Sequence, residues 1–311
     1  MEHAFFRSAR MLAAGALTLL VSAPVHAQQF DLGPEQPGRL HTQKDPKAAS
    51  ALPKDFKFAR AGVLTVAVAV GAPPITAYAT DAKTVIGFDP DLASLVAESL
   101  GLKLELLSVA WADWPLGLTS GKYDAVISNV GVTEQRKRKF DFSTYRQGLH
   151  GFYVKKDGPI TSIKEPKDVA GLRIIVSSGT IQERILLEWD KQNTANGLKP
   201  LELQYYDDDA AADLALQSGR ADANLGPNAV QAWQAATLGR KRLVGTINAG
   251  WPLTVEVGVT TRKGSGLAEP ISIAIDGLIA SGQYQATLSR WNLTPEGLQA
   301  SKVNPPGLPA N

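Results

Sequence analysis

One arginine combines a side chain suited to binding anions with a setting that invites it. Arg136 ends the segment Thr133–Arg136, which reads Thr-Glu-Gln-Arg. A guanidinium pairs with a planar carboxylate through two parallel hydrogen bonds and keeps its charge when it is buried. Arg136 also begins the basic run 136–139, and such runs are usually solvated surface. We predict that Arg136 binds a carboxylate and that the rest of the run is surface, with a surface role for Arg136 as the alternative.

A second potential anion site is the turn Gly179-Thr180-Ile181-Gln182, which leads into a predicted helix. The free N–H groups and the dipole at a helix N-terminus favour an anion. Capping of an ordinary helix by Thr180 would give the same pattern. Taken alone, the turn is therefore a weak indication of a binding site.

Other chemistries find little support in the sequence. The chain has no cysteine, which excludes disulfides, thiolate zinc sites, a cysteine nucleophile and a lipid-anchoring cysteine. It lacks the Gly-x-Ser-x-Gly motif of hydrolases, and His150 is expected to be structural or on the surface. The acidic run 207–209 fits a turn and a helix cap better than a calcium site. We therefore predict no catalytic residue, no metal and no cofactor.

Composition and the N-terminus bear on partners and location. The formal net charge of +2 gives no reason to expect nucleic acid or an anionic membrane as a partner. Arg7 and Arg10 precede the apolar stretch 11–23, and small or β-branched residues follow up to Ala27. This pattern predicts a secretory signal peptide over residues 1–27 and a periplasmic protein without a lipid anchor. The apolar stretch is too short to span a membrane.

The elements that would position these residues alternate between strand and helix, which predicts an α/β fold with open sheets. In the helix after the first strand, Asp89 is the expected N-cap, Pro90 the first helical residue and Gly101 the stop. The first unit consists of strands at 63–70, 103–109 and 123–128, with helices at 90–100 and 114–120. The second consists of strands at 172–176, 201–206 and 221–225, with helices from about 182 and at 209–218.

Two such units predict two lobes with a cleft between them, where ligands bind at the carboxyl ends of strands. With 311 residues, the chain is long enough for two lobes of about 100–150 residues each. We expect helices at 271–279 and 284–291 to pack back on the first lobe. The segments in which the chain crosses between the lobes are expected to form a hinge. The predicted organisation is a flexible or loosely docked leader at 28–60, lobe 1 at 61–148 plus 256–300, lobe 2 at 149–255 and a tail at 301–311.

Five short segments, in order and spacing, carry a resemblance to a known family. They are 87–92 (GFDPDL), 121–125 (GKYDA), 133–143 (TEQR and FDFS), 179–183 (GTIQE) and 219–223 (GRADA). Together they resemble the family 3 extracellular solute-binding proteins, the polar amino-acid-binding proteins of ABC importers. The resemblance implies a two-lobed periplasmic-binding-protein fold (type II-like), with helices on both faces of open sheets. It also implies a monomer that captures an amino acid or small carboxylate and delivers it to an inner-membrane ABC permease.

In that family, the arginine of the Thr-x-x-Arg motif holds the ligand's α-carboxylate, which implies this role for Arg136. The upstream segment with Ser128, Asn129 and Gly131 would contribute short side chains and backbone groups, although an ordinary turn glycine is an alternative for Gly131. Trp111 would stack on the ligand, or else be a core or surface aromatic. Thr180, Ile181 and Gln182 would close on the carboxylate from lobe 2, Ile181 through its backbone N–H only.

Two departures from the family pattern concern the ligand. The position that usually holds an aspartate for the ligand's ammonium is Pro227, and Asn228 follows it. A buried ammonium without an anion is costly, so either Asn228 or another group compensates, or the ligand is not an ordinary α-amino acid. The loop at 71–74 also lacks the acid and tyrosine that often bind cationic side chains, which disfavours lysine, arginine and histidine.

Two alternatives to transport remain at this point. Some relatives with this fold are dehydratases of cyclic acids, and a cyclohexadienyl-dehydratase-like enzyme would need a general acid in the cleft. Glu183 is the candidate, although favourable charge in the first turn of a helix explains it more simply. A periplasmic solute sensor is the other alternative, and the sequence does not distinguish it from an importer subunit.

Overall fold

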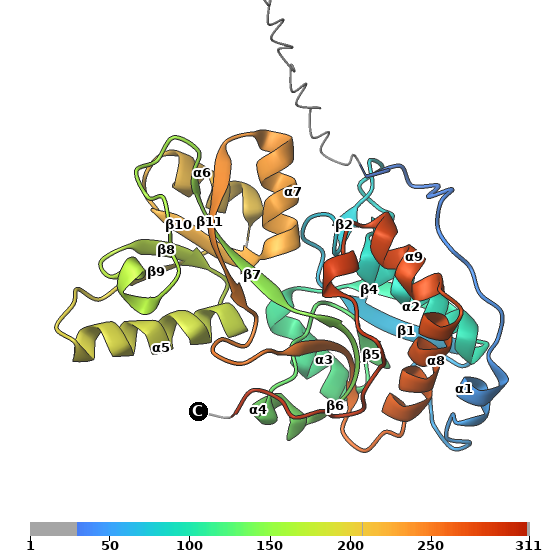
Figure 1. Cartoon of the computed structure of the whole chain (residues 1–311). Coiled ribbons are helices and arrows are strands. Elements are labelled where there is room, and N and C mark those ends of the chain that lie inside the picture. The colour runs from blue at the N-terminus through green and yellow to red at the C-terminus, as the bar shows by residue number, and fades with distance from the viewer. Residues whose placement is uncertain (1–29, 207, 310–311) are drawn as a thin grey trace, which may run out of the picture.

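The computed structural model describes residues 30–206 and 208–309 as two lobes, each built on a five-stranded sheet (Figure 1). The predicted signal peptide, residues 1–27, lies outside the described residues. The strand order is β4-β1-β5-β12-β6 in lobe 1 and β11-β7-β10-β8-β9 in lobe 2. Both sheets are open and mixed, which confirms the predicted two-lobed α/β class.

Lobe 1 places helices on both faces of its sheet. β1 pairs in parallel with β4 and β5, and β12 pairs antiparallel with β5 and β6. The strands are β1 (Val63–Val68), β4 (Lys103–Ser108), β5 (Ala125–Val126), β6 (Phe140–Gln147) and β12 (Glu256–Arg262). Helices α2 (Phe88–Leu100), α8 (Ala268–Ala280) and α9 (Gln283–Arg290) share one core, and α3 (Trp114–Ser120) belongs to the other. The two C-terminal helices thus pack on lobe 1, as expected.

Lobe 2 is built in the same way. β8 pairs in parallel with β9 and β10, and β7 pairs antiparallel with β10 and β11. The strands are β7 (Leu149–Lys155), β8 (Arg173–Val176), β9 (Glu202–Tyr205), β10 (Ala223–Pro227) and β11 (Lys241–Asn248). The helices are α5 (Ile181–Ala195), α6 (Asp209–Gln217) and α7 (Asn228–Leu238). The chain passes between the lobes twice, from β6 to β7 and from β11 to β12.

The smaller elements lie mostly in the connections. They are α1 (Pro46–Ser50), β2 (Ala77–Tyr78), β3 (Val85–Ile86), η1 (Trp111–Asp113), α4 (Glu134–Lys137), η2 (Pro166–Val169) and η3 (Thr294–Glu296). η1 and α4 bring two predicted site residues, Trp111 and Arg136, to the cleft side of lobe 1. η3 brings Glu296 to the same cavity from the C-terminal part of the chain.

The start of α2 differs from the prediction. The helix begins at Phe88, two residues before the predicted start at Pro90, with Gly87 as its N-cap at a φ of 131°. Asp89 is fully buried rather than capping, and its carboxylate accepts hydrogen bonds from the Asn129 N–H and the Tyr145 hydroxyl, both at 3.0 Å. Gly101 ends the helix in the left-handed conformation, as predicted. Asp89 therefore links the helix to the strand ends at the cleft.

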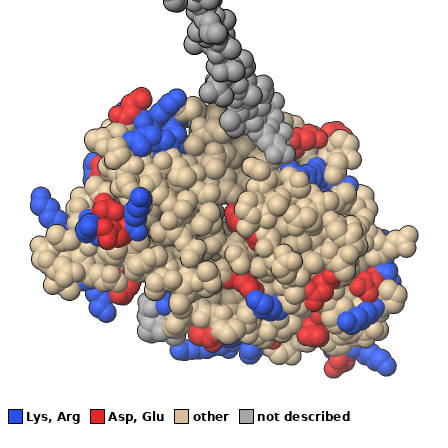
Figure 2. Space-filling model, viewed as in Figure 1, with Lys and Arg blue, Asp and Glu red and all other residues tan. Residues whose placement is uncertain are grey.

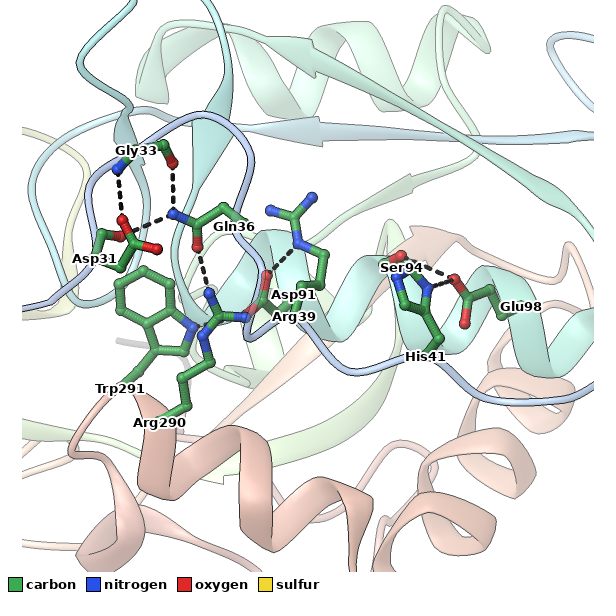
Figure 3. A network of polar contacts seen from close by, with 10 residues as sticks. All are labelled: Asp31, Gly33, Gln36, Arg39, His41, Asp91, Ser94, Glu98, Arg290 and Trp291. Carbon is green, nitrogen blue, oxygen red and sulfur yellow. Dashed lines mark hydrogen bonds and ion pairs between the residues drawn. The ribbon is translucent and has the colours of Figure 1, made fainter.

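The leader was expected to be flexible or loosely docked, and residues 30–60 lie against lobe 1. Arg39 donates to the Asp91 carboxylate at 2.7 Å, and the His41 ring contacts Glu98 at 2.7 Å (Figure 3). Arg290 and the Trp291 indole of lobe 1 also donate to Asp91 (Figure 3). A buried acid on α2 thus gathers donors from both ends of the described chain. Removal of the leader would take away only the Arg39 donor, and the donors from Arg290 and Trp291 would still bind the Asp91 carboxylate.

The tail was expected to resemble the leader, and residues 301–309 are likewise docked. Val303 forms a bridge with Ser143 of β6, and Leu308 forms one with Thr133. Leu308 is buried, and its carbonyl accepts from the Glu134 N–H at 2.8 Å. The tail therefore supports the segment that leads to Arg136.

The surface gives little indication of a charged partner on the face seen in Figure 2, where basic and acidic side chains are interspersed. Within residues 30–206 and 208–309, no helix is both long and apolar enough to cross a bilayer.

Candidate functional site

A cavity of about 510 Å³ lies between the lobes, a size typical of small-molecule sites. Its walls are the segments that follow the carboxyl ends of β1, β4 and β5 in lobe 1 and of β8 and β9 in lobe 2. This is where open α/β sheets place ligands. Eight of the nine predicted site residues line it: Trp111, Ser128, Asn129, Gly131, Arg136, Thr180, Ile181 and Gln182.

Arg136 bridges the two lobes. Its Nη1 donates to the Gly131 carbonyl at 2.8 Å, and its Nη2 donates to the Gly179 carbonyl of lobe 2 at 3.3 Å. The guanidinium carbon lies 5.6 Å from the Trp111 ring centroid and 5.8 Å from that of Trp114, within the range of a cation–π contact. Desolvation lowers the pKa of Arg136 to about 10, so the group stays charged at neutral pH.

No carboxylate of the described residues forms an ion pair with this partly buried cation. A buried charge is usually paired, because its desolvation is otherwise uncompensated. The guanidinium has five N–H donors, and two carbonyls engage only part of them. The guanidinium of Arg136 thus keeps N–H donors beyond those bound to the two carbonyls.

The segment after β5 supplies the lobe 1 wall. The Ser128 hydroxyl accepts from the Ala69 N–H at 2.8 Å, which ties the ends of β1 and β5 together. Asn129 adopts a φ of +53°, and its N–H donates to Asp89. Gly131 contacts lobe 2 directly, since a Cβ at this position would overlap the Cδ1 of Ile181. Any larger residue here would displace the end of the Ile181 side chain from its contact with lobe 1.

Behind this wall lies a buried charged group that the sequence analysis did not identify. Arg146, in β6, is 2% exposed and donates to both Glu296 and the side-chain oxygen of Asn129. Burial, as the largest cause, raises the pKa of Asp89 to about 6, partly offset by the charge of Arg146. Arg146 and Glu296 line the cavity but neutralise each other. An arginine inside the largely buried strand 140–147 was the signal that could have revealed it.

On the lobe 2 side, the predicted turn begins helix α5. Thr180 is its N-cap, with the hydroxyl accepting from the Glu183 N–H at 3.2 Å and donating to the Ser177 carbonyl at 2.6 Å. Ile181 and Gln182 are buried and face the cavity in the first turn. The helix cap and the cavity wall are therefore the same residues.

Three further residues of lobe 2 matter that sequence reasoning missed or misplaced. His150 of β7 lines the cavity and is 4% exposed; burial lowers the pKa of its ring to about 3. Gln231 of α7 lines the cavity and is 5% exposed, and the Lys241 ammonium donates to its side-chain oxygen. Burial lowers the pKa of Lys241 to about 8. The glutamine was not noticed because its helix, α7, was not predicted.

The sequence profile of the bacterial extracellular solute-binding proteins, family 3, matches residues 64–294. The chain belongs to this family. Among relatives, it is 31% identical over 233 residues to the L-cystine-binding protein TcyJ of Escherichia coli (strain K12), covering 74% of this chain and 82% of that protein.

Solved structures of family 3 proteins show the same fold. An ancestral arginine-binding protein bound to arginine has 30% identity and a TM-score of 0.65, covering 74% of this chain and 98% of that one. An ancestral amino-acid-binding protein, described as a precursor of cyclohexadienyl dehydratase, has 27% identity and a TM-score of 0.63, covering 74% of this chain and 95% of that one. The two-lobed fold predicted from the motifs is thereby confirmed.

Asn228 is the predicted site residue that does not line the cavity. It is the first residue of α7, and its side-chain oxygen accepts from the Tyr153 hydroxyl at 3.1 Å, against Gly151. Pro227, at the position where the family usually has an acid, does line the cavity. Asn228 thus does not replace the missing carboxylate, because its side chain is engaged elsewhere in lobe 2.

Glu183 is likewise turned away from the cavity wall. Its carboxylate accepts from the Gly179 N–H at 2.6 Å and so closes the turn before α5. Glu183 is not among the residues that line the cavity. Glu183, the general acid that the dehydratase alternative would require, is therefore engaged in holding the turn.

Proposed function

We propose that the chain is the periplasmic solute-binding subunit of an ABC importer, which captures a small carboxylate-containing solute between its lobes. The observation that carries the proposal is Arg136, a partly buried cation on the cavity wall with no described carboxylate as its partner. Relatives named for binding cystine and arginine belong to the same family, and both of these ligands carry a carboxylate.

Binding would proceed by hinge closure. A solute enters between the lobes and pairs its carboxylate with the Arg136 guanidinium, which accepts a planar carboxylate through two N–H groups. Lobe 2 then brings the first turn of α5 onto the solute, where free N–H groups favour the anion. Gly131 and Ile181 meet in this arrangement and exclude water at that edge. A permease could distinguish the closed form by its altered outer faces.

The proposal further holds that the protein is a monomer, is exported by residues 1–27 and is not an enzyme. The position of Glu183, bonded to Gly179 and away from the cavity, argues against a general acid at that place. Incubation with cyclic carboxylic acids should therefore release no new product detectable by mass spectrometry, even for acids that bind. Catalytic turnover of a bound acid would contradict this part of the proposal.

Thermal unfolding against a solute panel tests the proposed function. The panel contains α-amino acids, the same acids without the α-amino group, and cyclic carboxylates. A solute present at about 100 times its dissociation constant adds about 2.7 kcal/mol to the free energy of unfolding, which gives a clear rise in Tm. Stabilisation by at least one carboxylate, lost in Arg136→Ala, is expected. A complete absence of stabilisation across the panel would reject the proposed function.

A further inference from the structure

The hydrogen-bonding groups of the cavity wall indicate which class of carboxylate it accepts, an inference that rests on the proposed function. Gln231 lies over Gly226, where a Cβ would be only 3.0 Å from its Nε2. The Lys241 ammonium donates to the Gln231 oxygen from the side away from the solvent. Lys241 is 5% exposed and also donates to Gln234.

The cation fixes which end of the amide faces the cavity. An ammonium can only donate hydrogen bonds, so Gln231 must turn its oxygen toward Lys241. The amide NH2 then points the other way, and its one bond within the described residues is a marginal 3.5 Å contact to the Asn224 oxygen. Gln231 thus turns its oxygen to Lys241 and leaves its donor end for other partners.

The opposite wall repeats the arrangement with different residues. Arg146 also has donors only, and it binds the side-chain oxygen of Asn129. The amide NH2 of Asn129 is left without an acceptor among the described residues. Each lobe therefore has one cavity-lining carboxamide whose oxygen is held by a buried cation.

The acidic side chains near the cavity do not change the donor character of these two amides. Glu296 lines the cavity but is bound to Arg146, and Asp209 lines it but is exposed and accepts from Gln234 at 3.1 Å. Asp213, which lies behind the wall, pairs with Arg240. Pro227 offers neither a carboxylate nor an N–H. An α-ammonium entering from the solvent would therefore meet no buried, unpaired carboxylate among the described residues that line the cavity.

We infer that the cavity recognises a carboxylic acid that carries a second oxygen acceptor and no α-ammonium group. One carboxylate would pair with Arg136, and the second carboxylate or carbonyl would accept from the Gln231 and Asn129 amides. In this arrangement Gln231 and Asn129 touch the solute, and Lys241 is a positioning residue that acts through Gln231.

Three five-carbon acids separate the effect of a second carboxylate from the effect of an α-ammonium. Their affinities are measured by calorimetry on the purified protein. Pentanoate has one carboxylate, glutarate has two, and glutamate has two plus the ammonium. Dithiodipropionate and L-cystine form a longer pair that differs in the same ammonium groups. We expect the acids without an ammonium to bind about tenfold tighter than their amino counterparts, and glutarate about tenfold tighter than pentanoate.

Variants then assign the effect to Gln231 and Lys241. Gln231→Leu should weaken glutarate about tenfold and leave pentanoate within about twofold. Lys241→Met should reduce the glutarate-to-pentanoate ratio in the same direction, a change that a loss of stability alone would not produce. Gln234→Leu is the matched control, because Gln234 shares Lys241 and helix α7 but does not line the cavity; it should leave the ratio unchanged.

Tighter binding of glutamate and L-cystine than of their counterparts would overturn the inference and leave the proposed function standing. The same holds if none of these five acids binds while other carboxylates of the broader panel stabilise the protein. An unchanged ratio in Gln231→Leu would also overturn it, because the donor would then not contact the solute.

Discussion

In lobe 1 a cation, Arg136, reaches the cavity directly, whereas in lobe 2 the cation Lys241 stands behind the amide of Gln231. A charge in direct contact with the solute contributes attraction. A charge behind an amide instead sets the direction of a neutral donor. The comparison teaches that affinity and selectivity can be assigned to different walls of one cleft, with lobe 1 as the main source of affinity.

Loss of the direct cation should have the largest effect. Arg136→Ala is expected to weaken carboxylate binding by about 2–5 kcal/mol, since it leaves the solute's carboxylate unpaired in a closed cleft. Isothermal calorimetry with the best ligand of the panel measures this. Arg138→Ala is the control, because Arg138 is an exposed neighbour two residues along. If the two variants bind the ligand with equal affinity, Arg136 of lobe 1 is not the cation that pairs with the carboxylate of the solute.

The lobes should also respond to acid in opposite directions. In lobe 2, the pKa of His150 falls to about 3 on folding, so the unfolded chain takes up the proton first. Stability is therefore lost as the pH falls below about 6.5, by about 2 kcal/mol at pH 5. In lobe 1, the pKa of Asp89 rises to about 6, so the folded chain takes up the proton first and gains stability as the pH falls from about 7 to 5.

Urea unfolding at pH 7 and pH 5 separates the two groups. His150→Leu should lose less stability on acidification than the parent protein, and Asp89→Asn should lose more. Because each variant is compared with itself at two pH values, any constant cost of the substitution cancels. Changes of the same sign in both variants would contradict the assignment of opposite responses to the lobes.

The direct cation of lobe 1 could be predicted from the sequence, but the cation behind an amide in lobe 2 could not. The residues of lobe 1 follow strand ends and lie in short motifs of the family, so the resemblance was enough to bring Arg136, Asn129 and Gly131 to the cavity. Gln231 and Arg146 depend on which residues come to lie behind them, and such contacts join positions far apart in the chain. Asn228 was misplaced for the same reason, because its partner Tyr153 lies on a different strand.

The contacts of the two termini could not be predicted for a related reason. A polar, proline-rich composition suggested a loose leader, yet single long-range contacts hold it. Arg39 reaches Asp91 across 52 positions, and Gln36 is 3% exposed against Arg290. Composition describes the average tendency of a segment and not the few partners that decide whether it docks.

Placing a charge directly on the lobe 2 wall should make the two walls alike. Pro227→Asp introduces a carboxylate where the family usually has one, and it should shift preference toward glutamate over glutarate by about tenfold, or about 1.4 kcal/mol. Pro227→Asn is the matched control of equal size without charge. If both variants shift the preference equally, the change comes from the lost proline ring rather than from electrostatics.

The smallest expected effect concerns the cap of α5, the element by which lobe 2 meets the solute. Thr180→Ala removes the bond from the Glu183 N–H and the bond to the Ser177 carbonyl. It should lower the free energy of unfolding by about 1 kcal/mol, while Thr180→Ser should retain most of it. Ligand affinity distinguishes the roles of the turn. If Thr180 only caps the helix, affinity follows stability and changes little, since the backbone N–H groups of Ile181 and Gln182 remain. If affinity in Thr180→Ala falls as far as in Arg136→Ala, lobe 2 contributes directly to anion binding, and the assignment of affinity mainly to lobe 1 is wrong.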